Sequence, residues 1–175
     1  MGLFDGIKQA QATKSSSYIQ PGQYLARIDK VKASESRNKI PNFIIEMTAL
    51  HHIAAQDGSN GVGNKMTHII SRKQEDYFLP NIKGFLACAV NVHEDEITEE
   101  VCIEACGEDQ PLEGRVVEVH AQTIITQQTE SAFTKVSYMK SFSYSEVASL
   151  LTEAEIKRFY PDNLLDRLIK EESEE

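Results

Sequence analysis

Residues 21–34 read PGQYLARIDKVKAS, a run in which apolar and polar side chains alternate after a Pro-Gly turn. Tyr24 and Ile28 fall on one side of an extended chain with this pattern. The next apolar residue is Val31 rather than Lys30, so the alternation slips by one position. A slip of this kind is typical of a β-bulge, where one strand carries an extra residue. We therefore predict a long strand that bends just after Ile28.

Four more stretches alternate in the same way, and two stretches have helical spacing. The alternation predicts strands at NFIIEMTALHHI (42–53), KMTHIIS (65–71), RVVEVHAQTII (115–125) and FTKVSYMKSF (133–142). Apolar spacing predicts a main helix within residues 72–92, started or kinked by Pro80, and a shorter helix within residues 97–107. Thr98 is expected to open the shorter helix, and Gly107 to end it. The Gly-rich stretch 54–64 and the polar stretch 127–132 are expected to be turns.

The expected order is three strands, a helical insert and two further strands. This order is typical of an OB-fold, a five-stranded, partly open Greek-key barrel. An SH3-like barrel lacks a helix at this place, and an α/β sheet needs helices between most of its strands. The predicted fold class is mainly β, with a helix between strands three and four. We expect a flexible N-terminal arm (1–20), an OB-fold domain (21–143) and an acidic tail that is helical and partly disordered (144–175).

Charge is distributed unevenly along the chain. The net charge is −9, but residues 1–93 hold 11 Lys and Arg against seven Asp and Glu, whereas residues 94–175 hold seven against 20. Such asymmetry indicates that one part meets a polyanion or a partner while the other part repels or mimics one. The first half is therefore where we look for a nucleic-acid-binding surface.

Composition also bears on the location of the protein. No apolar run approaches the ~18 residues of a membrane-spanning helix. The first residues lack the long apolar segment of a signal peptide. The three cysteines are odd in number and fit a reducing compartment. We therefore expect a cytoplasmic protein with no membrane partner.

Five segments together resemble a known family. They are PGQYLARIDKVKAS, NFIIEMTAL, NIKGFLACAVNV, LEGRVVEVHAQT and FTKVSYM, spread over residues 20–142 and followed by an acidic ending. This combination resembles the single-stranded DNA-binding proteins of tailed bacteriophages, which are OB-fold replication proteins with acidic C-terminal tails. The shared features are aliphatic alternation, a helix with small residues and a Leu-Glu-Gly turn. The resemblance implies coating of single-stranded DNA during replication or recombination, in the cytoplasm of a host cell.

Binding of single strands without sequence preference needs a positive surface along the backbone and aromatic rings that stack on bases. Basic residues gather on the first three predicted strands and their loops, although each one taken singly can equally be a solvated surface residue. The typical OB ligand face crosses strands two and three and is flanked by loops one–two and four–five. The candidate nucleic-acid-binding residues are Arg27, Lys30, Lys32, Arg37, Lys39, Lys65, His68, Arg72, Lys73, Tyr77, Lys83 and Lys135.

Aromatic side chains are few. Tyr24 and Phe43 share strand faces with aliphatic residues, so they are expected in the core. Tyr77 follows two basic residues at the junction of strand and helix and is the best candidate for stacking. Phe133 and Tyr138 can stack or be buried, and burial is favoured for Tyr138.

No motif of a common enzyme class occurs in the chain. A phosphate-binding loop and a G-x-S-x-G nucleophile elbow are both missing. Cys102 and Cys106 stand four residues apart on the shorter predicted helix, but a zinc site typically needs a second pair of ligands. Their apolar neighbours favour packing. We expect no enzymatic activity, no cofactor and no metal.

The C-terminal residues carry two patterns. Thr152 and Glu155 form a capping box that opens a short helix, and Pro161 ends it. An apolar stripe on the last helix can then dock on the protein's own barrel, pair two subunits or bind a partner. The final EESEE (171–175) is expected to be disordered, because repelling charges without apolar residues cannot offset the ordering entropy. The predicted partner-binding tail residues are Leu164, Leu165, Leu168, Ile169, Glu171, Glu172, Glu174 and Glu175.

Together with these patterns, the resemblance implies a protein that coats single-stranded DNA largely without sequence preference during phage replication or recombination. We hypothesise that the tail carboxylates compete with DNA for the basic surface and, once released, recruit replication or recombination proteins. A homo-oligomer is compatible with the sequence. The alternative is an OB-fold protein–protein adaptor in a replication or recombination assembly that contacts DNA weakly.

Overall fold

The computed structural model describes Lys8 and residues 19–55, 62–73, 75–125, 132–160 and 162–173. The predicted N-terminal arm lies almost entirely outside these residues. Most of the two predicted turns, Pro161, Glu174 and Glu175 also lie outside them. All statements below concern the described residues.

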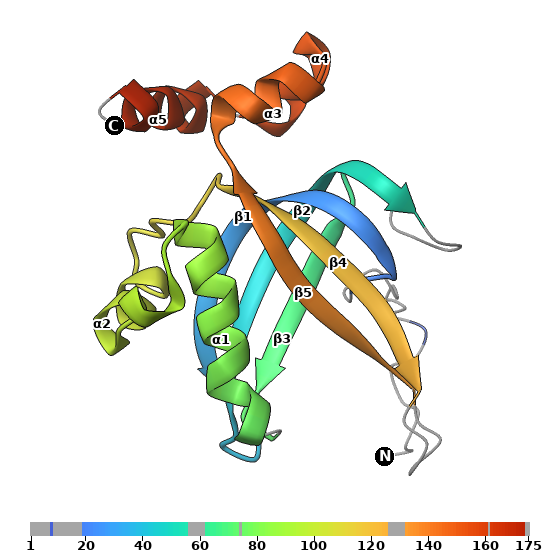
Figure 1. Cartoon of the computed structure of the whole chain (residues 1–175), viewed down its shortest axis with the longest axis vertical. Coiled ribbons are helices and arrows are strands. Elements are labelled where there is room, and N and C mark those ends of the chain that lie inside the picture. Colours follow the sequence, from blue (N-terminus) through green and yellow to red (C-terminus); the bar gives the residue numbers. More distant parts are fainter. Residues whose placement is uncertain are drawn as a thin grey trace.

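The elements follow the predicted order of strands and helices (Figure 1). Three strands come first, helices follow the third strand, and two more strands and the C-terminal helices complete the chain. The protein is mainly β, with helices around one sheet. The strands are β1 (Gly22–Glu35), β2 (Pro41–Ala55), β3 (Lys65–Ser71), β4 (Val116–Ile125) and β5 (Ala132–Phe142). The helices are α1 (Glu75–Val90), the 3-10 turn η2 (Glu94–Glu96), α2 (Glu99–Ala105), α3 (Tyr144–Leu150), α4 (Glu153–Phe159) and α5 (Asp162–Ser173).

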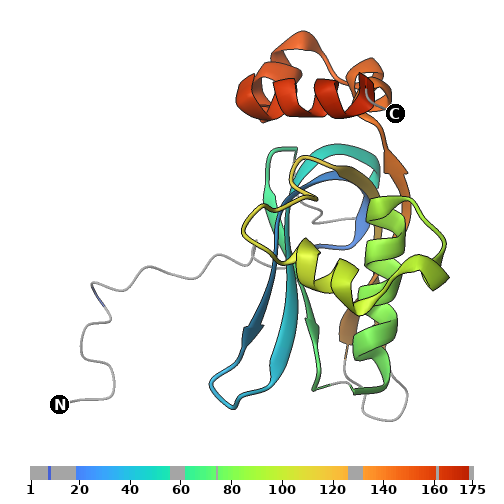
Figure 2. The ribbon, with the colours of Figure 1, turned by 90° about the vertical axis from the view of Figure 1, so that its left-hand side faces the viewer.

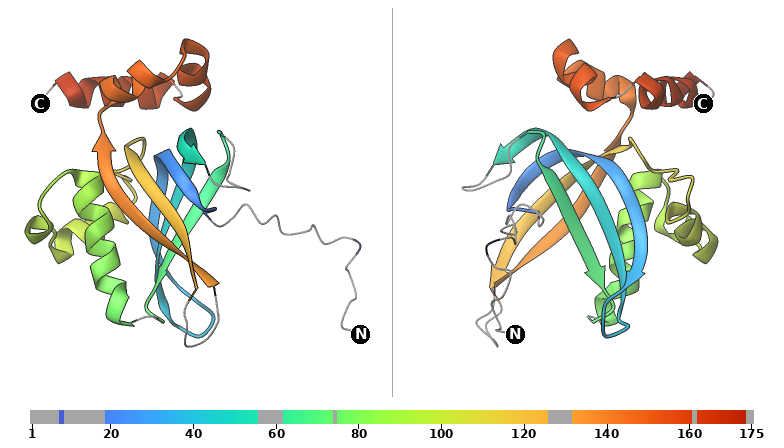
Figure 3. Two further views of the ribbon diagram at one scale, coloured as in Figure 1. Left: turned by 45° about the vertical axis from the view of Figure 1, so that its right-hand side comes forward. Right: turned by 180° about the vertical axis from the view of Figure 1, so that it is seen from behind.

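The strands form one antiparallel sheet in the order β3-β2-β1-β4-β5. The central strand β1 pairs with β2 along its length and with β4 from Gly22 to Arg27. The sheet curls strongly, as the turned views show (Figures 2 and 3). Within the described residues, the edge strands β3 and β5 do not pair with each other, so backbone hydrogen bonds do not close a barrel.

The predicted bulge in β1 is confirmed. Ile28 pairs with Met47 and Lys30 pairs with Glu46, so Asp29 is the extra residue. Its carboxylate is held on both oxygens. Arg27 Nε donates to Oδ1 at 2.9 Å, and Thr48 Oγ1 donates to Oδ2 at 2.6 Å. The side chain of the extra residue thus fixes the bend to the neighbouring strand.

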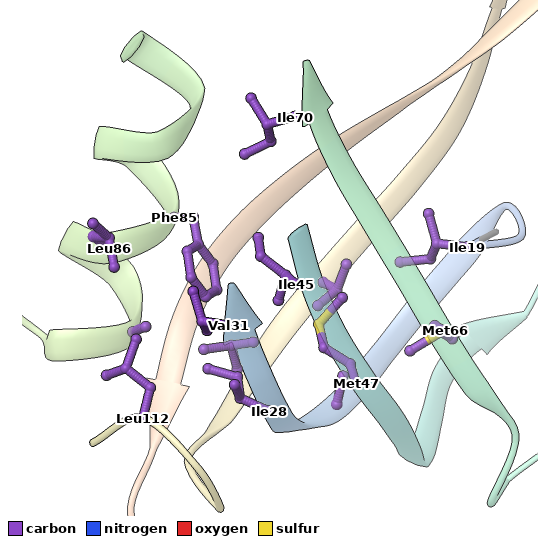
Figure 4. Close-up of a cluster of buried hydrophobic side chains, with 14 of the residues drawn as sticks. Ile19, Ile28, Val31, Ile45, Met47, Met66, Ile70, Phe85, Leu86 and Leu112 are labelled. Carbon is purple, nitrogen blue, oxygen red and sulfur yellow. The ribbon is translucent and has the colours of Figure 1, made fainter. Parts of the chain in front are cut away.

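One large apolar core fills the inner side of the sheet. Tyr24 and Phe43 are buried there, as predicted. Figure 4 shows Phe85 of α1 next to Val31 and Ile45 of the sheet. The ring of Phe85 meets Phe43 edge-on, at 6.0 Å between centroids. Helix α1 therefore covers the core.

Of the two roles predicted for Pro80, to start or to kink the main helix, the first is wrong, because Pro80 lies inside the helix. Helix α1 begins at Glu75, five residues earlier, with Glu75 and Asp76 in its first turn. Acidic residues favour a helix N-terminus because they face the positive end of the helix dipole. The shorter helix begins as expected, since Thr98 Oγ1 accepts from Val101 N.

A second apolar cluster joins the C-terminal helices to the sheet. Leu25, Leu50 and Val116 come from the opposite side of the sheet to the main core. Leu164 and Leu168 of α5 pack in the same cluster as these strand residues. Of the three roles left open for the apolar stripe, the structure shows the first, docking on the protein's own sheet.

Two features of this C-terminal region differ from expectation. Helix α3 was missed, although Ser143 and Glu146 form a capping box of the kind found at Thr152. The expectation that EESEE is disordered is wrong for Glu171–Ser173, which belong to α5. Glu172 accepts hydrogen bonds from Ser145 N and Oγ, so contact with α3 anchors the charged end.

Replacing Asp29 by Asn tests the lock on the bulge. We expect the free energy of unfolding to fall by about 1.5–3 kcal/mol, the usual range for a hydrogen bond to a charged group. Urea unfolding measures this change. Glu46→Gln is the control, because its ion pair with Lys32 is exposed and such pairs contribute about 0–1 kcal/mol. Equal losses in the two variants would contradict the proposed lock.

Replacing Leu168 by Ala tests the docking of α5. Leu168 is 7% exposed and its neighbour Ile169 is 48% exposed. We expect Leu168→Ala to destabilise the protein by about 2 kcal/mol or more, because burial and packing are both lost. Ile169→Ala, the matched control, should change stability by about 0.5 kcal/mol or less. Urea unfolding and amide hydrogen exchange in α5 distinguish the two.

Candidate nucleic-acid interface

Strand pairing places four of the predicted basic residues on one surface. Side chains alternate across a strand, so residues next to the buried ones face away from the core. Thr48 of β2 pairs with Arg27 of β1 on one side and with Lys65 of β3 on the other. Ile44 of β2 pairs in the same way with Lys32 and Ile69. We call the side of β1, β2 and β3 that faces away from the core the outer face. It carries Arg27, Lys30, Lys32 and Lys65.

Two carboxylates partly balance these four cations. Asp29 lies 2.8 Å from Arg27 Nη2 and 3.8 Å from Lys65 Nζ. Glu46 lies 2.9 Å from Lys32 Nζ. Lys65 is 81% exposed, so its charge remains accessible to a ligand. The outer face thus keeps a positive balance in a chain whose net charge is −9.

Arg37 and Lys39 lie at the exposed tip of the β1–β2 hairpin. The turn is closed by Lys39 N, which donates to Ser36 O at 2.8 Å. Arg72 lies beside the turn end of this hairpin, because its backbone N donates to the O atom of Pro41, the first residue of β2. Its guanidinium lies 3.1 Å from the Glu75 carboxylate, which partly neutralises its charge.

A cleft of about 790 Å³ separates the edge strands β3 and β5. Four predicted residues line it, namely His68, Lys73, Tyr77 and Lys135. The described residues of its lining include no carboxylate. The other described lining residues are Ile19, Thr67, Ile69, Ile70, Ser71, Asn81, Ile124, Thr134 and Val136.

Tyr77 is the most exposed aromatic ring of this cleft, at 63%. It comes from the first turn of α1, where the helix meets the end of β3. Asn81, one turn further along, also lines the cleft. The sequence analysis missed Asn81 and Thr134 because uncharged polar residues carry no signal of their own. Lys83 is half-buried on α1 and is not part of the lining.

His68 and Tyr138 connect β3 and β5 at the wall of the cleft. The Nδ1 atom of His68 lies 2.7 Å from the Tyr138 hydroxyl, and their ring centroids are 5.7 Å apart. Tyr138 also meets the ring of Phe85 at 4.8 Å. A side-chain hydrogen bond therefore joins two edges that backbone pairing leaves apart.

Burial keeps both partners of this bond neutral near pH 7. It lowers the pKa of His68 to about 4. Burial also raises the pKa of Tyr138, and the neighbouring Cys88 raises it further. A neutral imidazole offers no charge to a phosphate. The predicted contact of His68 with nucleic acid stays a prediction. In the structure, the His68 side chain bonds to Tyr138.

The predicted tail residues divide by exposure. Leu164 and Leu168 are buried against the sheet, Leu165 is half-buried and Ile169 is exposed. Glu171 lies 3.7 Å from Arg167 of its own helix. Among the described residues, the carboxylates of α3, α4 and α5 form no ion pair with a predicted nucleic-acid-binding residue. The docked helices are held by apolar packing and by Arg167 Nη2 of α5, which donates to Glu113 O.

The cysteines are free thiols that pack at the edge of the main core. Burial raises the pKa of Cys102 and of Cys106. Burial and the nearby Glu118 raise that of Cys88 to about 11. In the described part of the chain, no three metal-ligating side chains lie close enough to hold an ion. No helix there is long and apolar enough to cross a bilayer.

Comparison with models of known protein families and with curated proteins found no match. The assignment of a site therefore depends on charge, exposure and geometry. By these criteria the outer face and the cleft form the candidate interface. They adjoin at β3, because Thr67, Ile69 and Ser71 belong to both.

Replacing His68 by Gln tests the buried hydrogen bond. The folded pKa of about 4 is below the ordinary value of about 6.5. Between pH 6.5 and 4, His68 is therefore protonated in the unfolded chain but neutral in the folded chain. The free energy of unfolding thus falls as the pH drops through this range. This linkage contributes about 3 kcal/mol above pH 6.5. His68→Gln should flatten that part of the pH profile measured by urea unfolding.

The exposed His51 provides the control for loss of a histidine. His51→Gln should leave the profile between pH 4 and 6.5 as in the wild type. Parallel profiles for the wild type and His68→Gln would contradict the assignment.

Proposed function

We propose that this protein binds single-stranded DNA through the cleft between β3 and β5 and the adjoining outer face. One observation carries the proposal. In a chain of net charge −9, Lys73, Lys135 and the exposed ring of Tyr77 line one cleft whose described lining has no carboxylate. Positive charge beside an exposed ring is the combination that single-strand binding requires.

The expected mode of binding follows from the chemistry of these groups. Lysines at the cleft and on the outer face attract the phosphates, and Tyr77 offers a stacking surface to a base. Stacking contributes about 1–3 kcal/mol per base and tolerates any sequence, since every base has a π-face. Phosphate contacts add a salt-dependent, sequence-independent term. The protein therefore binds single strands largely without sequence preference.

We assign the fold to the OB type as part of this proposal. The order β3-β2-β1-β4-β5, with β1 at the centre and α1 between β3 and β4, supports it. In an OB-fold, β3 and β5 lie side by side. Here His68 and Tyr138 bridge these two strands. This hydrogen bond lies where β3 and β5 would come together in a closed barrel.

The biological setting that we propose is the coating of single strands during phage DNA replication or recombination. The resemblance of the strand and helix segments to phage single-stranded DNA-binding proteins supports this setting. In this role the protein is a binding protein without catalytic activity. The C-terminal helices modulate binding, and their exposed acidic residues, such as Glu171, recruit replication or recombination partners.

Replacing Tyr77 by Ala tests the site. Fluorescence anisotropy with a dT oligomer of about 16 nucleotides or more measures the affinity. We expect a loss of about 1–3 kcal/mol for one unstacked base. Tyr77→Phe should retain affinity, because the ring remains. Leu79→Ala is the surface control, since Leu79 is 68% exposed on the same helix and is not in the cleft lining.

Salt dependence provides the second readout. Each phosphate contact contributes about −0.7 to the slope of log K against log salt for single strands. Lys73→Gln and Lys135→Gln should each make the slope less steep by about that amount. Absence of single-strand binding by the wild type at low salt would overturn the proposed function and favour a protein–protein adaptor.

A further inference from the structure

The last turn of α4 lies against the turn between β2 and β3. A Cβ atom added to Gly63 would lie 2.5 Å from Arg158 Nη2 and 3.6 Å from the ring of Phe159. Gly63 has φ +90°, a conformation that a glycine adopts readily. The positive φ favours glycine at this position, and the missing side chain leaves room for the Arg158 guanidinium beside the turn.

This contact brings three cations from different elements to one corner of the outer face. Lys65 follows Gly63 by two residues and is 81% exposed. Arg27 lies in the same cross-strand row as Lys65. Arg158 adds the third charge from α4. We call Arg27, Lys65 and Arg158 the corner cluster.

Helix α4 contacts the strands on this side through its aromatic end. The guanidinium of Arg27 lies 6.0 Å from the ring centroid of Tyr160. Arg158 itself lies over Phe159 at 5.0 Å. Phe159 and Tyr160 are both buried, so packing fixes the helix end beside the strands. Lys157 and Arg158 are exposed at the end of that helix.

Two described carboxylates on the elements that form the corner cluster already have partners. Asp29 binds Arg27 and Thr48 and is 3.8 Å from Lys65. On α4 itself, Glu155 caps the first turn through Thr152. The last turn of α4 is about 6 Å further along the axis, at 1.5 Å per residue. The end of α4 that meets the sheet is therefore its basic end.

The acidic end of the C-terminal helices lies elsewhere. Glu172 of α5 binds Ser145 at the beginning of α3. Figure 1 shows this end of α5 at the opposite end of the helical layer from α4. The acidic end of α5 and the basic end of α4 are thus separated in space.

We propose, on the basis of the proposed function, that the docked C-terminal helices extend the DNA-binding surface rather than compete with DNA for it. Arg158 and Lys157 contact phosphates of the single strand together with Lys65. The bound strand passes from the corner cluster along β3, where Thr67 and Ile69 face both surfaces, and enters the cleft. The ligand at the corner is the phosphate backbone of a single strand.

Docked helices that bind phosphate have the opposite effect on DNA affinity to that expected from the acidity of the tail. Competition by tail carboxylates predicts tighter DNA binding when the helices are released. A phosphate-binding α4 predicts weaker binding. The two outcomes are opposite, so one measurement separates them.

Arg158→Gln and the double variant with Lys157→Gln test the contact. Anisotropy with the same dT oligomer, over a salt series, measures affinity and slope. We expect affinity at low salt to fall about threefold to tenfold per contact and the slope to become less steep by about 0.7 per contact. Both side chains are exposed, so the fold should persist, as circular dichroism and urea unfolding will check.

Lys170→Gln is the matched control, because it removes the same charge from an exposed site in α5. It should leave affinity and slope as in the wild type. Leu168→Ala, which loosens the docking of α5, should weaken DNA binding.

The failures of the two proposals can be told apart. A wild type that binds no single strand overturns the proposed function and this inference with it. A wild type that binds, with Arg158→Gln and Lys170→Gln equal in affinity and slope, overturns this inference alone. Tighter binding by Leu168→Ala also overturns it and supports competition by the tail.

Discussion

The bend of β1 at Asp29 is the constraint on which the rest of the structure depends. Pairing of β1 with β4 ends at Arg27, and beyond the bulge β1 continues with β2. One strand thus serves two parts of a strongly curled sheet, and a bulge supplies the extra twist that this requires. The Asp29 carboxylate ties the bend to Arg27 and Thr48. Curling brings the edge strands β3 and β5 to the two sides of one cleft.

The unpaired edges β3 and β5 give this protein its candidate binding surface. An open edge exposes backbone groups that can pair with another chain, which natural proteins usually prevent. Here α1 covers the inner side through Phe85, and His68 bonds to Tyr138 between the edges. The space that remains is lined by Lys73, Tyr77 and Lys135. Because β3 and β5 do not pair, α1 can cover the core between them, and an accessible cleft remains on the outer side.

Much of the fold could be predicted from the sequence because the signals are local. Alternation located the five strands, the slip after Ile28 located the bulge, and Thr152 located the start of α4. The errors have different causes. Helix α1 extends before Pro80 for a local reason, its acidic first turn. The bond of Glu172 to Ser145, a tertiary contact, orders residues that charge repulsion alone would leave disordered. In the candidate site, Tyr77 and Lys73 were predicted, but Asn81 and Thr134 enter only because two distant strands meet.

By itself the sequence determined the order of elements, the uneven charge and the apolar stripe of the last helix, because each depends on residues close together in the chain. Only the tertiary structure decided how these features combine. It packs the stripe on Leu25, Leu50 and Val116. It places Arg158 beside Gly63, next to Lys65. Such contacts join residues about 50 to 140 positions apart, and their geometry depends on how the sheet curls, which no local pattern encodes. The acidic C-terminal region is therefore, in space, a docked layer whose basic end meets the sheet.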